Sequence, residues 1–317
     1  MTDLEFGRLS YGAAAAGNLY RAIDDEQAAA TLDAAWECGV RYFDTAPHYG
    51  LGLSERRLGR MLQMRPRDEF CVSTKVGRLL KPNPDGADQM DNLHFVVPAT
   101  SKRVWDMSES GIRRSHEESL ERLGLDHVDI LYLHDIEAYD ADDAIARGLP
   151  ALCKLRDEGL VSAIGVGSGS VDAQLKAVRT GAVDLIMLAG RYTLLEQPAL
   201  NDLLPECEER GIRVVNAAIF NSGLLATPVP RSDSHYEYLV APPEILQHAH
   251  DLLRVCTEFG VELPAAALQY TLRHPAVATV VIGAHNPEQI RQNADRMSVD
   301  IPDGLWTRLA EDGLIPA

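Results

Sequence analysis

The chain has 317 residues and an acidic composition. It carries 30 Lys and Arg against 47 Asp and Glu, a formal net charge of −17, and 46% of its residues are hydrophobic. That apolar content is typical of a globular protein with a sizeable core, not of a disordered chain. The negative charge argues against nucleic acid or an anionic membrane as a partner, because both need a basic face. The length permits one large domain or two ordinary ones.

The cysteines and the first residues favour a cytoplasmic protein. The five cysteines are dispersed without a C-x-x-C pair, which is typical of reduced thiols. The chain starts MTDLEFG, with acidic residues where a signal peptide needs a basic start. No segment approaches the roughly 20 apolar residues of a membrane span. We therefore expect a cytoplasmic protein without a membrane segment; the oligomeric state stays open.

Short apolar runs alternate with longer amphipathic segments along the whole chain. This alternation is typical of β-α-β units on a parallel sheet. Each of four predicted helices is followed by a glycine that can end it: 24–38, 108–123, 142–158 and 197–210. Strands are predicted at 10–15, 41–44, 70–75, 128–134, 163–167, 184–189, 213–218 and 279–282.

Eight such units favour an α/β fold of the (β/α)8 TIM-barrel type over a doubly wound open sheet, which uses the same alternation. No linker or low-complexity tract divides the chain, so we expect residues 1–317 to form a single barrel domain. Two long irregular stretches, 77–108 and 220–243, are expected to be βα loops. Such loops leave the C-terminal ends of barrel strands, where active sites lie.

Titratable residues end three successive predicted strands. Asp44 ends the second, Lys75 the third and His134 the fourth, while Tyr49 lies in the loop after the second. Because equivalent strand ends converge on one face of a barrel, the four side chains are expected to share a pocket. Each has an ordinary structural explanation when taken alone, such as a helix cap for Asp44. Their shared placement favours a catalytic site.

The four residue types suit acid/base chemistry on a carbonyl or an alcohol. A free phenol has a pKa near ~10, and an adjacent ammonium stabilises the phenolate and lowers that pKa. We therefore expect Lys75 to lower the pKa of Tyr49. Asp44 would hold Lys75 charged and in position, and His134 would hydrogen-bond the substrate oxygen.

Four segments in this order resemble the aldo-keto reductase family: FDTAPHYGLGLSERRLG at 43–59, STKVG at 73–77, SLERLGLDHVDILYLHD at 119–135 and VVIGAHNPEQIRQN at 280–293. The resemblance implies a barrel that binds a nicotinamide dinucleotide without a Rossmann fold. It also implies that Asp44, Tyr49, Lys75 and His134 are the catalytic tetrad. Hydride would move between nicotinamide and the substrate carbon, while Tyr49 exchanges the proton on oxygen.

Two further segments, 101–126 and 188–197, resemble the branch that holds aldose 1-dehydrogenases for L-fucose and D-threo-aldoses together with pyridoxal 4-dehydrogenase. This implies oxidation of a sugar's anomeric carbon to a lactone, or the parallel oxidation of the pyridoxal hemiacetal. Other functions left open are a general aldehyde or ketone reductase and a cofactor-binding regulatory subunit with little turnover. A metal-dependent barrel hydrolase or isomerase is the rival from another enzyme class.

The resemblance also implies where the cofactor binds, although several positions differ from the family pattern. Gly167-Ser168, Ala189 and Ala217 stand where the family usually has Ser-Asn, Gln and a stacking Tyr. Gly283 and Gln289 replace the basic residues that hold a 2′-phosphate in many relatives, so NAD is expected over NADP, with Arg291 able to compensate. The implied cofactor-binding residues are Ser168, Asn221, Ser222, Gly223, Leu224, Gly283, Ala284, Gln289 and Asn293.

The substrate is expected to be a small molecule with a sugar-like or pyridoxal-like aldehyde or hemiacetal. Trp105 is a candidate platform for its ring, because a large aromatic side chain stacks on either compound. Phe220 is the second candidate substrate contact. No H-E-x-x-H motif or Cys/His zinc spacing occurs, so no metal is expected. The segment GVGSGS at 165–170 lacks the third glycine of a dinucleotide fingerprint and is interpreted as a β-α turn.

Overall fold

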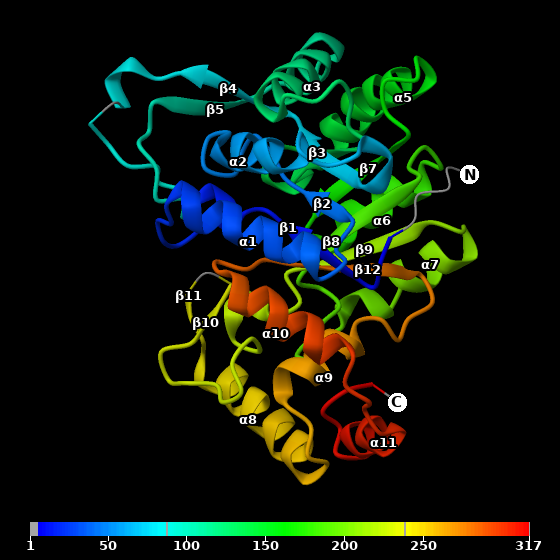
Figure 1. Ribbon diagram of the computed structural model, residues 1–317. Helices are drawn as coiled ribbons and strands as arrows, with labels where there is room; N and C mark the ends of the chain where they lie inside the picture. Colours follow the sequence, from blue (N-terminus) through cyan, green and yellow to red (C-terminus); the bar gives the residue numbers. More distant parts are fainter. Residues whose placement is uncertain (1–5, 87, 238, 317) are drawn as a thin grey trace.

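Eight parallel strands close into a barrel (Figure 1) in the computed structural model, which describes residues 6–86, 88–237 and 239–316. Going round the barrel, the order is β1, β2, β3, β6, β7, β8, β9 and β12, and β12 pairs with β1. The predicted (β/α)8 barrel and its eight strands are therefore confirmed. The strands are β1 (Leu9–Gly12), β2 (Tyr42–Asp44), β3 (Cys71–Val76), β6 (Ile130–His134), β7 (Ala163–Ser168), β8 (Leu185–Ala189), β9 (Arg213–Ala217) and β12 (Val277–Ile282).

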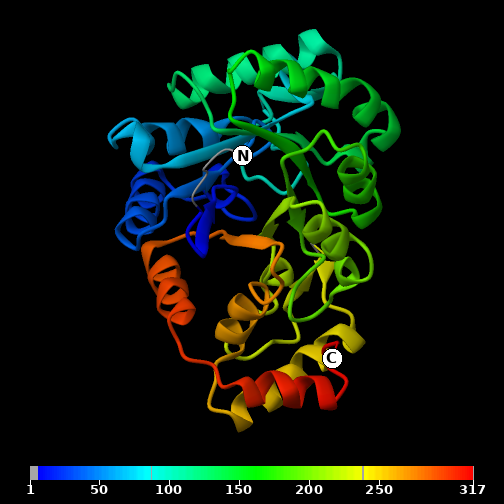
Figure 2. The same ribbon diagram turned by 90° about the vertical axis from the view of Figure 1, so that its right-hand side faces the viewer.

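Helices follow the strands and surround the barrel (Figure 2). The Asp24 side chain caps the first helix by accepting from the Gln27 amide at 2.7 Å, as its sequence suggests. The predicted helix 197–210 is shorter than expected, because Pro198–Leu200 form a 3-10 turn before it. The surrounding helices are α1 (Asp25–Glu37), α2 (Leu53–Leu62), α3 (Glu109–Leu123), α5 (Leu149–Asp157), α6 (Val171–Arg179), α7 (Leu203–Glu209), α9 (Leu263–Tyr270) and α10 (Pro287–Met297).

Three more helices lie outside this pattern. The short α4 (Ala141–Asp143) leads through a π turn into α5, and α8 (Pro243–Glu258) packs against α11 (Asp303–Glu311). Within the described part of the chain, no helix combines the length and apolarity needed to cross a membrane.

Both stretches expected to be irregular contain a β-hairpin. In the first, β4 (Arg78–Pro82) pairs antiparallel with β5 (Ser101–Trp105). In the second, β10 (His235–Tyr236) pairs with β11 (Leu239–Val240). The expectation of wholly irregular loops is wrong because these segments satisfy their backbone polar groups by pairing with each other. Both hairpins lie on the left of Figure 1, beyond the C-terminal ends of the barrel strands.

Alternate residues of the strands face the inside of the barrel, because successive strand side chains point to opposite faces. The interior is a buried cluster that includes Tyr42 of β2 and Tyr132 of β6. Their hydroxyls are 3.1 Å apart, and Tyr42 also lies 2.9 Å from the Ser73 hydroxyl. Two residues further along β2 and β6 are Asp44 and His134, which therefore face inward at the end of the barrel. The alternation of side chains along the strands thus places the candidate site inside the barrel, at the C-terminal ends of β2 and β6.

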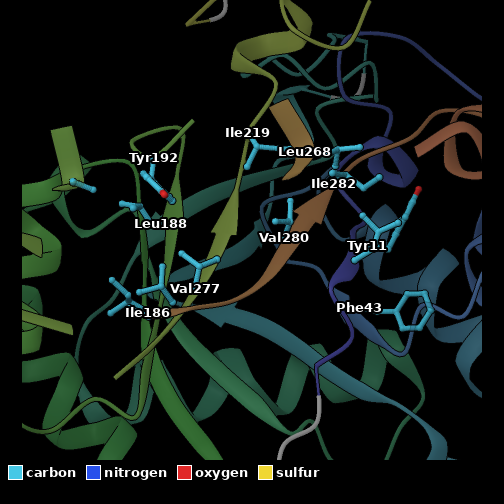
Figure 3. Packing of buried hydrophobic residues seen from close by; sticks show 14 of the residues in the cluster. Tyr11, Phe43, Ile186, Leu188, Tyr192, Ile219, Leu268, Val277, Val280 and Ile282 are labelled. Atoms are coloured by element: carbon cyan, nitrogen blue, oxygen red, sulfur yellow. The ribbon is translucent and has the colours of Figure 1, made fainter. Parts of the chain in front are cut away.

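The other strand face packs against the helices. Figure 3 shows Phe43 of β2, Ile186 and Leu188 of β8, and Val280 and Ile282 of β12 among these buried side chains. Each is at most 2% exposed. This apolar layer between strands and helices supplies most of the hydrophobic burial, and it keeps the strand ends in fixed register.

Helices α2 and α3 touch so closely at Gly59 that we expect Gly59→Ala to destabilise the protein. Alanine normally stabilises a helix relative to glycine by about 0.5–1 kcal/mol. Here the new Cβ would lie 2.1 Å from the Leu123 carbonyl oxygen, so the helices would have to move apart. We expect a loss of about 1–3 kcal/mol in the free energy of unfolding, measured by urea denaturation. The control is Gly7→Ala, whose Cβ would lie at an ordinary 3.6 Å from Leu9; equal stability of both variants contradicts the prediction.

Candidate active site

A buried ion pair lies at the C-terminal end of the barrel. Lys75 Nζ of β3 donates to Asp44 Oδ2 of β2 at 2.5 Å and to the Thr45 carbonyl at 3.0 Å. Ser73 Oγ donates to the other carboxylate oxygen at 2.6 Å. The two charged side chains are only 2% and 3% exposed. Burial acts to lower the pKa of Lys75, but Asp44 and Tyr49 outweigh it, so the pKa is raised and the ammonium stays charged.

Tyr49 lies beside this ion pair. Lys75 Nζ is 4.8 Å from the centre of the Tyr49 ring, and the Phe95 ring stacks on it at 5.8 Å. The loop is held by a close backbone crossing: Gly50 has φ +60°, and a Cβ there would lie 2.2 Å from the Gly17 oxygen. Only glycine allows this approach.

The pKa of Tyr49 is raised to about 12, because burial disfavours the phenolate and outweighs the opposing effect of Lys75. The expected net lowering of this pKa is therefore wrong for the protein without bound substrate or cofactor. Lys75 lowers the pKa of Tyr49, as predicted, but the effect of burial is larger. The side chain is a neutral phenol at neutral pH, able to donate a proton and able to accept one only after deprotonation.

His134 completes the group at the end of β6. Its ring lies 5.7 Å from the Tyr49 ring, centre to centre and nearly perpendicular, and 5.5 Å from the His48 ring. Burial first, then the charges of Arg78 and Lys75, hold the pKa of His134 well below its usual range. A neutral imidazole offers one N–H donor. The structure thus brings together the four residues that the sequence analysis grouped.

Several neighbours of this group were missed by the sequence analysis. Arg78 Nη2 donates to Asp135 Oδ2 at 2.7 Å, and the guanidinium lies 4.4 Å over the Trp105 ring. Trp105 in turn contacts Tyr139, with ring centres 5.4 Å apart. Trp105, a predicted substrate contact, therefore borders the site through Arg78. Their positions in the sequence could have indicated these two residues. Asp135 directly follows the end of one predicted strand, and Arg78 lies three residues after the end of another.

The ends of β7, β8 and β9 present small side chains next to this group. Ala189 and Ala217 are paired across β8 and β9, and a Cβ at Gly190 would meet nothing closer than Ala218 at 3.9 Å. Ser168, at the end of β7, is buried and accepts from the Ser170 amide at 2.9 Å. Side chains as small as these suit the approach of a flat ring, so the residues present fit the nicotinamide that the sequence analysis expects.

The turn after β9 holds Asn221, Ser222, Gly223 and Leu224. The amides of Asn221, Gly223 and Leu224 donate within the turn itself, so in this conformation they are not directed at a ligand. Asn221 Oδ1, in contrast, is buried without a hydrogen-bond partner among the described residues, while its Nδ2 donates to Glu196 at 3.0 Å. Phe220, the second predicted substrate contact, is half-buried at the start of this turn. The binding roles of this turn stay predictions.

The predicted adenosine contacts lie around α10. Gln289 is exposed and accepts from the His285 amide at 2.8 Å, and Asn293 lies buried one turn further on. Gly283 is exposed and Ala284 is buried just after β12. Arg291 is 3.5 Å from Glu37. Arg291, the residue that could replace the basic residues for a 2′-phosphate, therefore lies next to the Glu37 carboxylate.

A cavity of about 680 Å³ opens beside the ends of β7 and β8. Its lining includes Glu137, Asp172, Glu196 and Glu237, with Arg191 joined to Glu237 at 2.5 Å. None of these residues was predicted as a contact. Across the described chain, no three His, Cys, Asp or Glu side chains are grouped so that they could hold a metal ion.

Comparison with known proteins agrees with this architecture. The chain is 54% identical over 312 residues to a D-threo-aldose 1-dehydrogenase of Pseudomonas sp., covering 97% of this chain and 94% of the relative. It is 38% identical to the pyridoxal 4-dehydrogenase of Microbacterium luteolum, covering 99% and 96%. The solved structure of an aldo-keto reductase from Bacillus halodurans superposes with a TM-score of 0.77 at 26% identity, covering 98% and 93%.

The sequence pattern of the Aldo/keto reductase family matches residues 8–311, almost the whole chain. Together with the barrel and the four residues grouped at its C-terminal end, this match shows that the chain belongs to the Aldo/keto reductase family and is an oxidoreductase.

Proposed function

We propose that this protein is an aldose 1-dehydrogenase that oxidises the anomeric carbon of a sugar with NAD, giving a lactone. The observation that carries the proposal is the 54% identity, over 97% of the chain, with a D-threo-aldose 1-dehydrogenase. The aldo-keto reductase family uses a nicotinamide dinucleotide, which accepts the hydride when it is bound. The substrate is accordingly a small molecule with a free hemiacetal or aldehyde.

Four residues at the barrel end would perform the proton transfer. Tyr49, as phenolate, takes the hydroxyl proton while the hydride leaves the same carbon. Lys75 lies 4.8 Å from the Tyr49 ring and stabilises the negative phenolate oxygen. Asp44 keeps Lys75 charged in a place where an unpaired ammonium would be costly. Neutral His134 donates its N–H to the substrate oxygen and so fixes its orientation.

Small residues and polar side chains on the other half of the barrel would hold the cofactor. Ser168 would bind the nicotinamide end. Asn221, which has an unused buried acceptor, would contact the pyrophosphate together with Ser222, Gly223 and Leu224. Gly283, Ala284, Gln289 and Asn293 would contact the adenosine. Trp105 and Phe220 would border the substrate.

We further propose that residues 1–317 fold as one domain in the cytoplasm. All barrel strands of the described residues belong to one closed sheet, which supports the single domain. The five cysteines are all free, and free thiols are typical of a reducing compartment.

The purified protein is expected to form NADH with at least one of L-fucose, D-arabinose and L-galactose, and to do so faster than with pyridoxal. The assay follows absorbance of the reduced cofactor at equal substrate concentrations, with NAD and with NADP. Strong turnover of pyridoxal without turnover of any sugar refutes the proposed substrate class and favours a pyridoxal 4-dehydrogenase. Tight cofactor retention without oxidation of any compound favours a regulatory subunit instead.

Oxidation of the sugar is expected to accelerate with pH, because Tyr49 must be deprotonated to accept a proton. Its pKa is about 12, so the phenolate fraction rises about tenfold per pH unit below that value. We expect log kcat/KM for oxidation to climb between about pH 7 and 10. No fall is expected at the neutral end from His134, whose pKa lies well below its usual range.

Tyr49→Phe is the matched control for this profile. It keeps the ring that stacks on Phe95 and removes only the hydroxyl, so oxidation should fall by about 10²-fold or more and lose its pH dependence. Dinucleotide binding, measured by calorimetry, should be largely unchanged. Full activity of Tyr49→Phe, or a pH profile that this variant leaves unchanged, would exclude Tyr49 as the base.

We expect kcat/KM to be at least about tenfold higher with NAD than with NADP, because Gly283 and Gln289 stand where many relatives carry the basic residues that hold a 2′-phosphate. Arg291 is 56% exposed and 3.5 Å from Glu37, so Glu37→Gln should release it and improve use of NADP by up to about fivefold. Glu26→Gln, on the same helix but away from this pair, serves as the control. A tenfold preference for NADP in the parent enzyme contradicts the assignment.

A further inference from the structure

An ion pair that the sequence analysis did not assign lies directly beside His134. Arg78 Nη2 donates to Asp135 Oδ2 at 2.7 Å, and the same oxygen is 3.4 Å from His134 Nε2. The Arg78 side chain is 10% exposed and that of Asp135 is 35% exposed. The guanidinium is therefore mostly out of water, whereas the carboxylate reaches the open face of the barrel.

Arg78 is fixed in place but keeps an unused donor. It is the first residue of β4 and faces Trp105 across the hairpin, with its guanidinium 4.4 Å over the indole ring. Its Nε is buried and has no hydrogen-bond partner in the described parts of the chain. A buried donor without a partner is costly, so an acceptor oxygen brought by a ligand would be favoured here.

Asp135 is held in an unusual backbone conformation. Its φ is +44°, in the left-handed region that few residues other than glycine occupy, and its amide donates to the Gly167 carbonyl at 2.8 Å. Such strain persists where the surroundings impose it, often at functional sites. Within residues 6–86, 88–237 and 239–316, no group donates to Asp135 Oδ1, so this oxygen can accept from a ligand.

We propose that Arg78 and Asp135 form a subsite for the hydroxyl on the carbon next to the reacting carbon, which in an aldose is the 2-hydroxyl. Oxygens on adjacent carbons lie about as far apart as the two atoms of a hydrogen bond. A substrate whose reacting oxygen binds His134 therefore places the neighbouring oxygen near Asp135. The substrate hydroxyl donates a hydrogen bond to the Asp135 carboxylate, and its oxygen accepts a hydrogen bond from Arg78. The ligand class is an α-hydroxy aldehyde or its hemiacetal.

This subsite rests on the proposed function for the sugar but is tested separately from it. The parent enzyme is assayed on the best aldose of the panel and on its 2-deoxy form, and in the reverse direction, with NADH, on lactaldehyde and propanal. Each pair differs by one hydroxyl next to the reacting carbon. A site built to bind a hydroxyl rejects the compound that lacks it, so we expect kcat/KM to be at least about 10²-fold higher for the hydroxylated member.

The decisive variants are Asp135→Asn and Arg78→Met. Asparagine also tolerates a positive φ, so the backbone of Asp135→Asn should be retained. We expect each variant to lower the ratio of kcat/KM for the hydroxylated compound to that for the deoxy compound by about tenfold or more, because charge effects on His134 and Tyr49 act on both compounds alike. If Arg78 and Asp135 only held His134 in position, each variant would lower kcat/KM for both compounds by the same factor.

Asp91→Asn is the matched control. Arg103 of β5 and Asp91 form a comparable buried ion pair near the same hairpin, with contacts of 2.6 and 2.9 Å, but Asp91 is not adjacent to His134 in the chain. This variant should leave the hydroxyl-to-deoxy ratio as in the parent enzyme.

Three results would overturn the proposal: equal losses for both compounds in Asp135→Asn and Arg78→Met, a parent enzyme without preference for the hydroxyl, or a parent enzyme that turns over neither hydroxylated compound. Failure of every aldose together with a preserved preference for lactaldehyde over propanal would refute the proposed sugar substrate but support the subsite.

Discussion

The buried ion pair of Lys75 and Asp44 is the constraint on which the open end of the barrel depends. Two opposite charges at 2.5 Å, almost without exposure, are tolerable only as a pair, because loss of one partner leaves a buried charge that costs about 3–5 kcal/mol. The Ser73 hydroxyl and the Thr45 carbonyl complete their hydrogen bonds. The pair therefore keeps β2 and β3 in register and fixes a positive charge beside Tyr49.

That positive charge is one of three cations at the site, each paired with a carboxylate, in a molecule that is acidic as a whole. The chain carries a net charge of −17, yet Lys75, Arg78 and Arg103 gather at the site. After burial, these cations are what hold the pKa of His48 at about 2 and the pKa of His134 well below its usual range. Both imidazoles thus stay neutral. Lys75 favours the Tyr49 phenolate, whereas burial, Asp44 and Asp135 oppose it. An acidic protein can in this way host chemistry that develops negative charge on oxygen.

Two ion pairs at this end of the barrel come from different parts of the fold. The Lys75–Asp44 pair joins two neighbouring barrel strands, and the Arg78–Asp135 pair joins a hairpin to a barrel strand. Lys75 and Asp44 come from β3 and β2, whose positions the barrel sets. Arg78 comes from the β4/β5 hairpin and reaches back to Asp135 at the end of β6. A hairpin can vary without disturbing the barrel, so the substrate pocket and the reacting groups can change independently. The resemblance of the chain to enzymes named for different substrates is consistent with this division.

The sequence by itself determined the barrel, through eight alternating units. It also determined the group of Asp44, Lys75 and His134, because residues of equal parity at strand ends must meet on one face, with Tyr49 in the loop that follows Asp44. It did not predict the β4/β5 hairpin, since pairing between segments some twenty residues apart depends on register rather than on local pattern. Nor did it predict the Arg78 and Asp135 pair or the raised pKa of Tyr49. These depend on burial and on distances between side chains from separate elements, which only the tertiary structure decided.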